Sequence, residues 1–155
     1  MASDRAWSRF SSGLGDRGLR LVGKLNVPVY RLTNGRLMGR IGRAPVLLLT
    51  TTGRKSGESR TAPVVYLADR DRYVVIGSNA GNDRTPAWAL NLRADPKAEV
   101  QVRRAKLPVR ARIAEGEERA ELWKRVNEQY SGFDDYKERT SRDISVFVLE
   151  PVSAD

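Results

Sequence analysis

The sequence predicts an α+β fold, a split β-barrel of about six mostly antiparallel strands flanked by short helices. Six short apolar or alternating segments are separated by turn residues, and most of the connections are as short as those of hairpins. The chain of 155 residues has no internal repeat and no linker. We therefore expect one domain, residues 26–155, preceded by a basic segment, residues 1–25.

Positive charge is concentrated at the N-terminus. Residues 1–43 contain nine Lys and Arg against two Asp, whereas the other 112 residues carry 19 positive and 17 negative groups out of chain totals of 28 and 19. Apolar residues between Leu14 and Leu25 recur at helical spacing, which predicts a basic amphipathic segment. Such a segment can pack over the barrel or rest on anionic lipid, and the sequence leaves both interpretations open.

A short helix is predicted next, beginning at Asn26 before Val27-Pro28 and ending at Asn34-Gly35. No segment approaches the roughly 20 apolar residues of a membrane span, and the first residues lack the apolar core of a signal peptide. We expect a cytoplasmic protein whose contact with the inner face of the membrane, if the basic segment makes one, is peripheral. For the oligomeric state we expect a monomer or a weak homodimer.

The predicted strands begin with a continuous apolar, β-branched run, Val46–Thr52, which is typical of a strand buried on both faces. Gly53 ends it, and a second strand covers Arg60–Ala68. After a polar turn, a third strand covers Tyr73–Ser78, with Tyr73, Val75 and Gly77 on one face.

Helices interrupt the remaining strands. Thr85 is predicted to cap a short helix that has Pro86 at its first position and ends before Asp95. Further strands are expected at 98–103, 106–114 and 144–149. Between the last two lies a helix, 116–130, whose buried face is predicted to consist of Ala120, Trp123, Val126 and Tyr130.

The turn between the first two strands reads G-R-K-S-G. It sets Arg54, Lys55 and Ser56 between two glycines, and Arg60 opens the next strand. Glycines at both ends would allow positive φ and expose backbone N–H groups, so the tip offers fixed charges and amide donors to one anion. Taken alone, the same residues also fit a solvated basic turn.

Composition narrows the chemistry. The chain has no His and no Cys, which excludes Ser-His and Cys-His catalysis, disulfides and ordinary zinc sites, so we expect no bound metal. Carboxylates, Lys, Tyr, Ser and Arg remain. An enzyme built from them would most easily take its reactivity from a cofactor and supply binding and orientation itself.

Five motifs in order resemble the deazaflavin-dependent nitroreductase family, small actinobacterial reductases of the split-barrel, flavin-binding type. They are V-P-V-Y-R-L-T-N-G-R, L-L-L-T-T-T-G-R-K-S-G-E-S-R-T, G-S-N-A-G, P-A-W-A-L-N-L-R-A-D-P, and Y-S-G-F-D-D-Y with T-S-R-D-I and V-L-E-P. The resemblance runs from about Asn26 to Pro151. It implies binding of coenzyme F-420, whose ribityl chain carries a phosphate, a lactyl group and an oligoglutamate tail.

The resemblance also implies roles for residues. The phosphate and tail would be held by Arg54, Lys55, Ser56 and Arg60. The deazaflavin ring would be lined by Thr61, Ala62, Pro63, Val64 and Val65, by Ile76, Gly77, Ser78 and Asn79, and by Ala87, Trp88 and Asn91. The substrate pocket would include Phe133, Tyr136 and Ala89, and the candidate catalytic side chains are Tyr136, Tyr130 and Ser78.

Three positions depart from the family pattern. Asn79 stands where many members have Lys, Ala89 replaces a frequent aromatic residue, and Phe133 replaces a Tyr. The first removes a cation, and the second is expected to widen the pocket. Because phenylalanine cannot donate a proton, we expect hydride transfer to an electron-poor acceptor such as a quinone rather than efficient reduction of nitroimidazoles.

Other functions stay open at this point. FMN could replace F-420, although the basic hairpin suits a longer polyanionic tail, and the chain could be a cofactor carrier without catalysis. A nucleic-acid module is disfavoured, because the few aromatic residues do not alternate with the basic ones as stacking platforms require.

Overall fold

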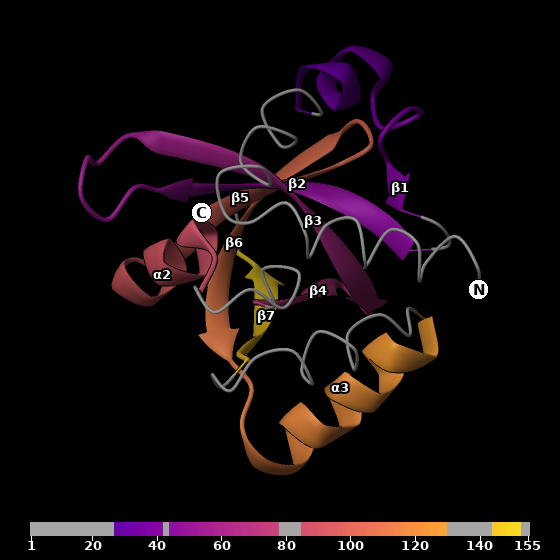
Figure 1. Ribbon diagram of the computed structural model, residues 1–155, viewed down its shortest axis with the longest axis vertical. Helices are drawn as coiled ribbons and strands as arrows, with labels where there is room; N and C mark the ends of the chain where they lie inside the picture. Colours follow the sequence, from indigo (N-terminus) through magenta and orange to yellow (C-terminus); the bar gives the residue numbers. More distant parts are fainter. Residues whose placement is uncertain (1–26, 42–43, 78–84, 130–143, 153–155) are drawn as a thin grey trace.

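The computed structural model describes residues 27–41, 44–77, 85–129 and 144–152. Strands β2 to β7 form a closed antiparallel barrel in the order β2-β3-β4-β7-β6-β5, with β5 paired back to β2 (Figure 1). This confirms the predicted fold class. The strands are β1 (Arg40–Ile41), β2 (Ala44–Thr52), β3 (Ser59–Asp69), β4 (Arg72–Ile76), β5 (Lys97–Val102), β6 (Ala105–Ile113) and β7 (Val146–Pro151); the helices are α2 (Ala87–Ala94), α3 (Gly116–Gln129) and residues 27–33.

Each predicted strand is present, and β1, a short strand paired to the start of β2, was not predicted. The prediction that β2 is buried on both faces is confirmed. Leu47 and Leu49 point into the barrel, whereas Val46 and Leu48 pack against the helix at residues 27–33. Side chains alternate across a strand, so a continuous apolar run is needed where both faces are covered.

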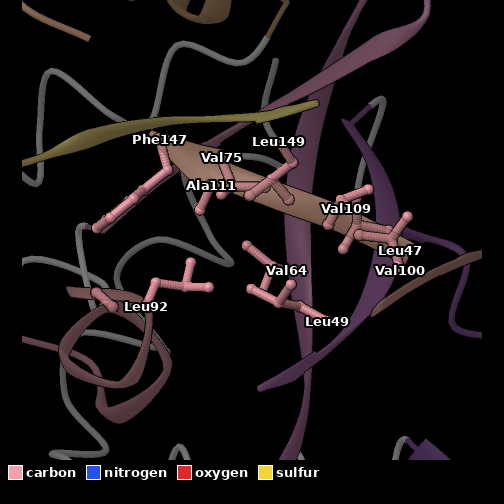
Figure 2. Packing of buried hydrophobic residues seen from close by; sticks show 11 residues of the cluster. Leu47, Leu49, Val64, Val75, Leu92, Val100, Val109, Ala111, Phe147 and Leu149 are labelled. Atoms are coloured by element: carbon pink, nitrogen blue, oxygen red, sulfur yellow. The ribbon is translucent and has the colours of Figure 1, made fainter. Parts of the chain in front are cut away.

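The barrel interior is filled by aliphatic side chains from β2 to β7 around Phe147, its one fully buried aromatic ring among the described residues. Figure 2 shows this cluster, in which the α2 residue Leu92 closes one end. Helix α2 begins differently from the prediction: Pro86 rather than Thr85 occupies the N-cap, at φ −61° and ψ 147°, and no side chain caps the helix. The carbonyl of Pro86 already accepts the N–H groups of Ala89 and Leu90, so the helix begins at Ala87.

Helix α3 covers the outside of the barrel. Its buried residues are Leu122 and Val126, with Trp123 partly buried beside them. The predicted face was therefore wrong at Ala120, which is exposed, because the helix is rotated so that Leu122 meets the sheet. Tyr130, the last residue of the predicted face, lies outside the described residues.

Ion pairs hold α3 in place. Arg125 pairs with Asp69 at 3.0 Å, and Arg112 links Glu118 of the helix to Glu150 of β7. The hydrogen bond from Arg125, followed by the one from Arg72, holds the pKa of the Asp69 carboxyl below its usual value. Strands β3, β6 and β7 are thus tied to one helix.

The helix at residues 27–33 is pinned by Tyr30. Its hydroxyl donates to the Val46 carbonyl at 3.0 Å and accepts the N–H of Arg103 at 2.9 Å, which joins β2 to the β5–β6 turn. Burial raises the pKa of the Tyr30 phenol, so it remains a donor at neutral pH. As predicted, Asn34 and Gly35 end the helix, at φ 51° and 78°.

Candidate functional site

The β2–β3 hairpin carries the predicted anion site. Thr52 pairs with Ser59, so the residues between them form the loop. The N–H of Gly57 donates to the Gly53 carbonyl at 2.8 Å, and the N–H of Gly53 donates to the Glu58 carbonyl at 2.8 Å. Figure 1 shows this hairpin extending past the barrel near α2. Its tip is therefore a tight, internally bonded turn.

The two glycines of the turn have different roles. Gly57 has a φ of +72°, as predicted, and its position is open to solvent. Gly53 does not have a positive φ, which corrects the prediction for that residue. A Cβ at Gly53 would lie 2.6 Å from the Ser56 Oγ and 3.2 Å from the Glu58 carbonyl oxygen, so a larger residue there would have to displace the Ser56 hydroxyl, which accepts the N–H of Glu58.

Most backbone donors at the tip are already used. Besides the two glycine amides, the N–H of Arg54 donates to Asn91 Oδ1 at 3.1 Å and the N–H of Glu58 donates to Ser56 Oγ at 3.2 Å. Within the described part of the chain, only the N–H groups of Lys55 and Ser56 lack an acceptor in this turn. They are adjacent, next to the cationic side chains.

Three exposed cations, Arg54, Lys55 and Arg60, belong to the same hairpin tip as these two amides. Arg60 pairs with Glu58 at 3.0 Å, but the side chains are 60% and 69% exposed, and exposed pairs contribute only about 0 to 1 kcal/mol. Arg54 and Lys55 have no acidic partner among the described residues. One acid against three cations leaves the tip able to hold a multiply charged anion by charge-assisted hydrogen bonds.

Asn91 of α2 fixes the tip to the barrel. It is 3% exposed, and while Oδ1 accepts the N–H of Arg54, Nδ2 donates to Thr51 Oγ1 at 3.0 Å. The amide that the sequence assigned to a cofactor contact is thus turned toward the protein. Its geometry is that of a residue that positions Arg54.

Replacing Asn91 with alanine is expected to lower the free energy of unfolding by about 1 to 3 kcal/mol, because Thr51 and the Arg54 amide lose a buried partner. Hydrogen exchange of the Arg54 amide should accelerate, while exchange in the middle of β4 stays unchanged. Asn91→Asp is the matched control, since it keeps the acceptor for Arg54. Unchanged exchange at Arg54 in the alanine variant would contradict this role.

The predicted ring-lining stretch on β3 divides between two faces. Ala62 and Val64 point into the barrel, whereas Val65 packs on the outer clusters. Thr61 also lies outside, where its Oγ1 is 2.8 Å from Thr50 Oγ1 and accepts a hydrogen bond from Arg31 at 3.2 Å. Alternation along a strand prevents these side chains from lining one surface together.

The predicted residues of β4 and α2 are mostly packed. Ile76 is buried beneath α3, and Gly77 is buried beside Ala89 and Phe147. The partly buried Trp88 ring meets the Phe147 ring edge-on at a centroid distance of 5.6 Å. Ala89 has no exposed surface, so it fills core space and does not widen an open pocket. Only Ala87 of this group is well exposed.

Ser78, Asn79, Tyr130, Phe133 and Tyr136 lie outside the described residues. The sequence analysis missed Arg31 and Thr50, which meet at Thr61 although they come from different elements. Arg31 belongs to the motif V-P-V-Y-R-L-T-N-G-R, but the sequence gives no sign that it contacts Thr61, 30 positions later.

Comparison with known proteins extends these observations. Residues 22–151 match the family model described as F-420H(2)-dependent quinone reductase. A curated F-420H(2)-dependent quinone reductase of Mycobacterium tuberculosis is 40% identical over 136 residues, which cover 85% of this chain and 91% of the relative.

Solved structures agree with this match. A structure described as F-420-H2 dependent reductase (FDR-A) is 38% identical, covers 68% of this chain and 94% of its own, and superposes with a TM-score of 0.64. Another, described as a domain-swapped dimer, is 35% identical with a TM-score of 0.66, covering 81% of this chain and 96% of its own. The heme storage protein HutZ of Vibrio cholerae shares the fold at 15% identity and a TM-score of 0.56, covering 82% and 90%.

Proposed function

Because this chain belongs to the F-420H(2)-dependent quinone reductase family, we propose that it reduces quinones with coenzyme F-420 as the hydride donor. The observation that carries the proposal is the tip of the β2–β3 hairpin, which combines exposed Arg54, Lys55 and Arg60 with two amides that have no acceptor among the described residues. A flavin without an anionic tail would leave most of these charges without a partner. An oligoglutamate tail would pair with them.

The chain's own residues supply binding and orientation. Arg54, Lys55 and Arg60 hold the phosphate and tail, and the amides and hydroxyl of the turn add directional donors. Charge-assisted hydrogen bonds of this kind are worth about 1.5 to 3 kcal/mol each when shielded from water. Asn91 acts on this binding indirectly, by keeping Arg54 in place.

Surface for the ring is offered by partly exposed residues, namely Thr61, Pro63 and Val65 on β3 together with Ala87 and Trp88 on α2. Val64 inside the barrel and Ile76 beneath α3 belong to the proposed set as packing residues, and buried Gly77 with Ala62, Ser78 and Asn79 completes it. Phe133 walls the acceptor side in this proposal.

When bound, the reduced deazaflavin supplies a hydride from its C5 position. The protein's part is to hold the acceptor close, exclude water and deliver a proton. With no His in the chain, the proton comes from Tyr136, Tyr130, Ser78 or solvent. A quinone suits this arrangement, because its oxygens can be protonated by solvent after the hydride has arrived.

Two parallel titrations test the function. The protein should bind F-420 at far lower concentration than FMN when each titration is followed by fluorescence, and the F-420H2 complex should reduce a soluble quinone. Tighter binding of FMN would favour an FMN-dependent oxidoreductase. Binding of F-420 without turnover would favour a carrier.

We further propose that residues 1–25 contact anionic lipid at the inner face of the membrane, where quinones reside, and that the protein is a monomer or a weak homodimer. None of the helices in the described part of the chain is long and apolar enough to span a membrane. The basic residues of the segment support a peripheral contact, since each cation near an anionic surface contributes about 1 kcal/mol.

Deleting residues 1–25 is expected to reduce sedimentation with acidic vesicles at low salt by an order of magnitude or more, because the segment carries about five cations. Quinone turnover with F-420H2 in the absence of lipid should not change. If the truncated and full-length proteins sediment equally, the segment packs on the barrel, as the alternative interpretation holds.

A further inference from the structure

Three of the five large exposed aliphatic side chains of the described residues lie close together in the sequence, one in the last turn of the first helix and two in the connector that follows it. Leu32 is 83% exposed, Leu37 59% and Met38 46%. All three belong to a stretch of seven residues. Single exposed aliphatic residues are ordinary, but three so close together on a small soluble domain mark a contact surface.

The connector between the first helix and β1, residues 34–39, carries Leu37 and Met38 and is held in place by hydrogen bonds. Thr33 Oγ1 donates to the Val29 carbonyl at 2.7 Å and accepts the N–H of Leu37 at 3.1 Å. Beyond it, the Gly39 carbonyl accepts the N–H of Val46 at 2.9 Å. Met38 adopts a φ of +63°, which few residues other than glycine do. The fold thus holds these side chains outward instead of burying them.

The β5–β6 turn lies beside this connector. The Tyr30 hydroxyl accepts a hydrogen bond from the N–H of Arg103. A Cβ at Gly35 would be 3.3 Å from the Arg103 Cα, so the connector and the β5–β6 turn are in contact. In Figure 1 the tip of the β5–β6 hairpin lies next to the helix at residues 27–33. The neighbouring side chains of Arg104 and Lys106 are exposed, as is Arg36 on the connector.

Acidic residues are absent from this region of the sequence. No Asp or Glu occurs between Asp16 and Glu58, and none between Glu99 and Glu115. Two segments, residues 32–38 and 104–106, therefore carry three large exposed aliphatic residues and three exposed cations, and neither segment contains an acid. We call this set, Leu32, Leu37, Met38, Arg36, Arg104 and Lys106, the basic–apolar edge.

We propose that the basic–apolar edge docks on an anionic lipid surface, with the aliphatic side chains entering the headgroup boundary and the cations meeting lipid phosphates and carboxylates. This combination is typical of proteins that lie on a membrane. A second copy of the chain is a poor occupant, because two such edges would repel each other. Nucleic acid is disfavoured, since the two turns offer no aromatic platform for bases.

The proposal deepens the membrane contact proposed above, but it concerns other residues. It assigns the docking to a folded edge of the domain and fixes its orientation, whereas residues 1–25 would add attraction only. Docking by this edge leaves the β2–β3 hairpin, which belongs to the opposite end of β2, free to bind the cofactor.

Vesicle sedimentation of the full-length protein tests the edge. Leu37→Ser with Met38→Ser, and separately Arg104→Gln with Lys106→Gln, should each weaken binding to phosphatidylcholine vesicles containing phosphatidylserine by roughly tenfold or more. The serine pair loses the apolar side chains that enter the headgroup boundary, and the glutamine pair loses two cations that contribute about fivefold each. Matched controls remove exposed groups of the same kinds elsewhere on the domain. They are Ile113→Ser with Val152→Ser, and Arg110→Gln with Lys124→Gln, and they should bind like the parent protein.

An F-420 titration of each variant separates this inference from the proposed function, since cofactor affinity should be unchanged in all four. Equal vesicle binding by parent and edge variants would overturn the docking surface even if deletion of residues 1–25 abolishes sedimentation. Equal losses in the control pairs would also overturn it, because they would show an effect of net charge or apolar content alone. Binding of the parent protein to RNA but not to vesicles would replace the lipid by a nucleic acid.

Discussion

Replacing Arg60 with alanine is expected to raise the Kd for F-420 by more than tenfold, and replacing Lys55 with alanine by about tenfold. Each change removes a charge-assisted hydrogen bond worth about 1.5 to 3 kcal/mol, and screening by solvent reduces this contribution at exposed side chains. The effect at Arg60 should be the larger, because Glu58, which pairs with it at 3.0 Å, is then left as an uncompensated negative charge beside the anion. Fluorescence titration measures both.

The pairing with Glu58 also provides an internal control. Adding Glu58→Gln to Arg60→Ala should recover part of the lost affinity, and Glu58→Gln alone should slightly tighten binding. Lys106→Ala removes the same charge from the far end of the barrel and should leave the Kd unchanged. FMN, which carries a phosphate but lacks the oligoglutamate tail, should bind poorly in every variant. Equal F-420 affinity in all variants would remove the hairpin from the site.

Replacing Phe133 with tyrosine is expected to raise nitroimidazole turnover by about 10² to 10⁴, the usual range of general acid catalysis, with little change for quinones. A nitroimidazole ring must gain a proton as the hydride arrives, and a phenol donor at this position could supply it. Quinones need no protein proton in the slow step. The measurement is kcat/KM for both acceptors in both proteins.

The affinity for F-420 should stay the same in this variant, which separates proton delivery from binding. Tyr136→Phe is the companion change: if Tyr136 already supplies the proton, its loss slows nitroimidazole reduction and Phe133→Tyr adds nothing. A ratio of the two activities that does not move in the Phe133→Tyr protein would show that position 133 does not face the acceptor.

Local patterns in the sequence determined the strands, the helices and the family. The run from Val46 to Thr52 predicted a strand covered on both sides, and the two sides prove to be the barrel interior and the first helix. The hairpin with Arg54, Lys55 and Arg60 could also be predicted from the sequence, because a tight turn places neighbouring residues together whatever the rest of the chain does.

Contacts between distant elements could be decided only by the tertiary structure. Periodicity indicates that α3 has a buried face, but its rotation, which exposes Ala120 and buries Leu122, follows from the sheet beneath it. The direction of the Asn91 amide depends on where Thr51 and Arg54 lie when the barrel closes. Composition predicts hydrogen-bonding capacity but not the partner.

The division of Thr61 to Val65 between two faces has the same origin. Motif resemblance assigns a contiguous stretch to one role, while a strand sends successive side chains to opposite sides, and barrel closure decides which side is buried. The basic–apolar edge could likewise not be predicted from the sequence, because its two segments are about 70 residues apart and become neighbours where the Tyr30 hydroxyl accepts the Arg103 N–H and Gly35 approaches Arg103. Sequence determines what each segment can be, and the closed barrel decides which segments become neighbours.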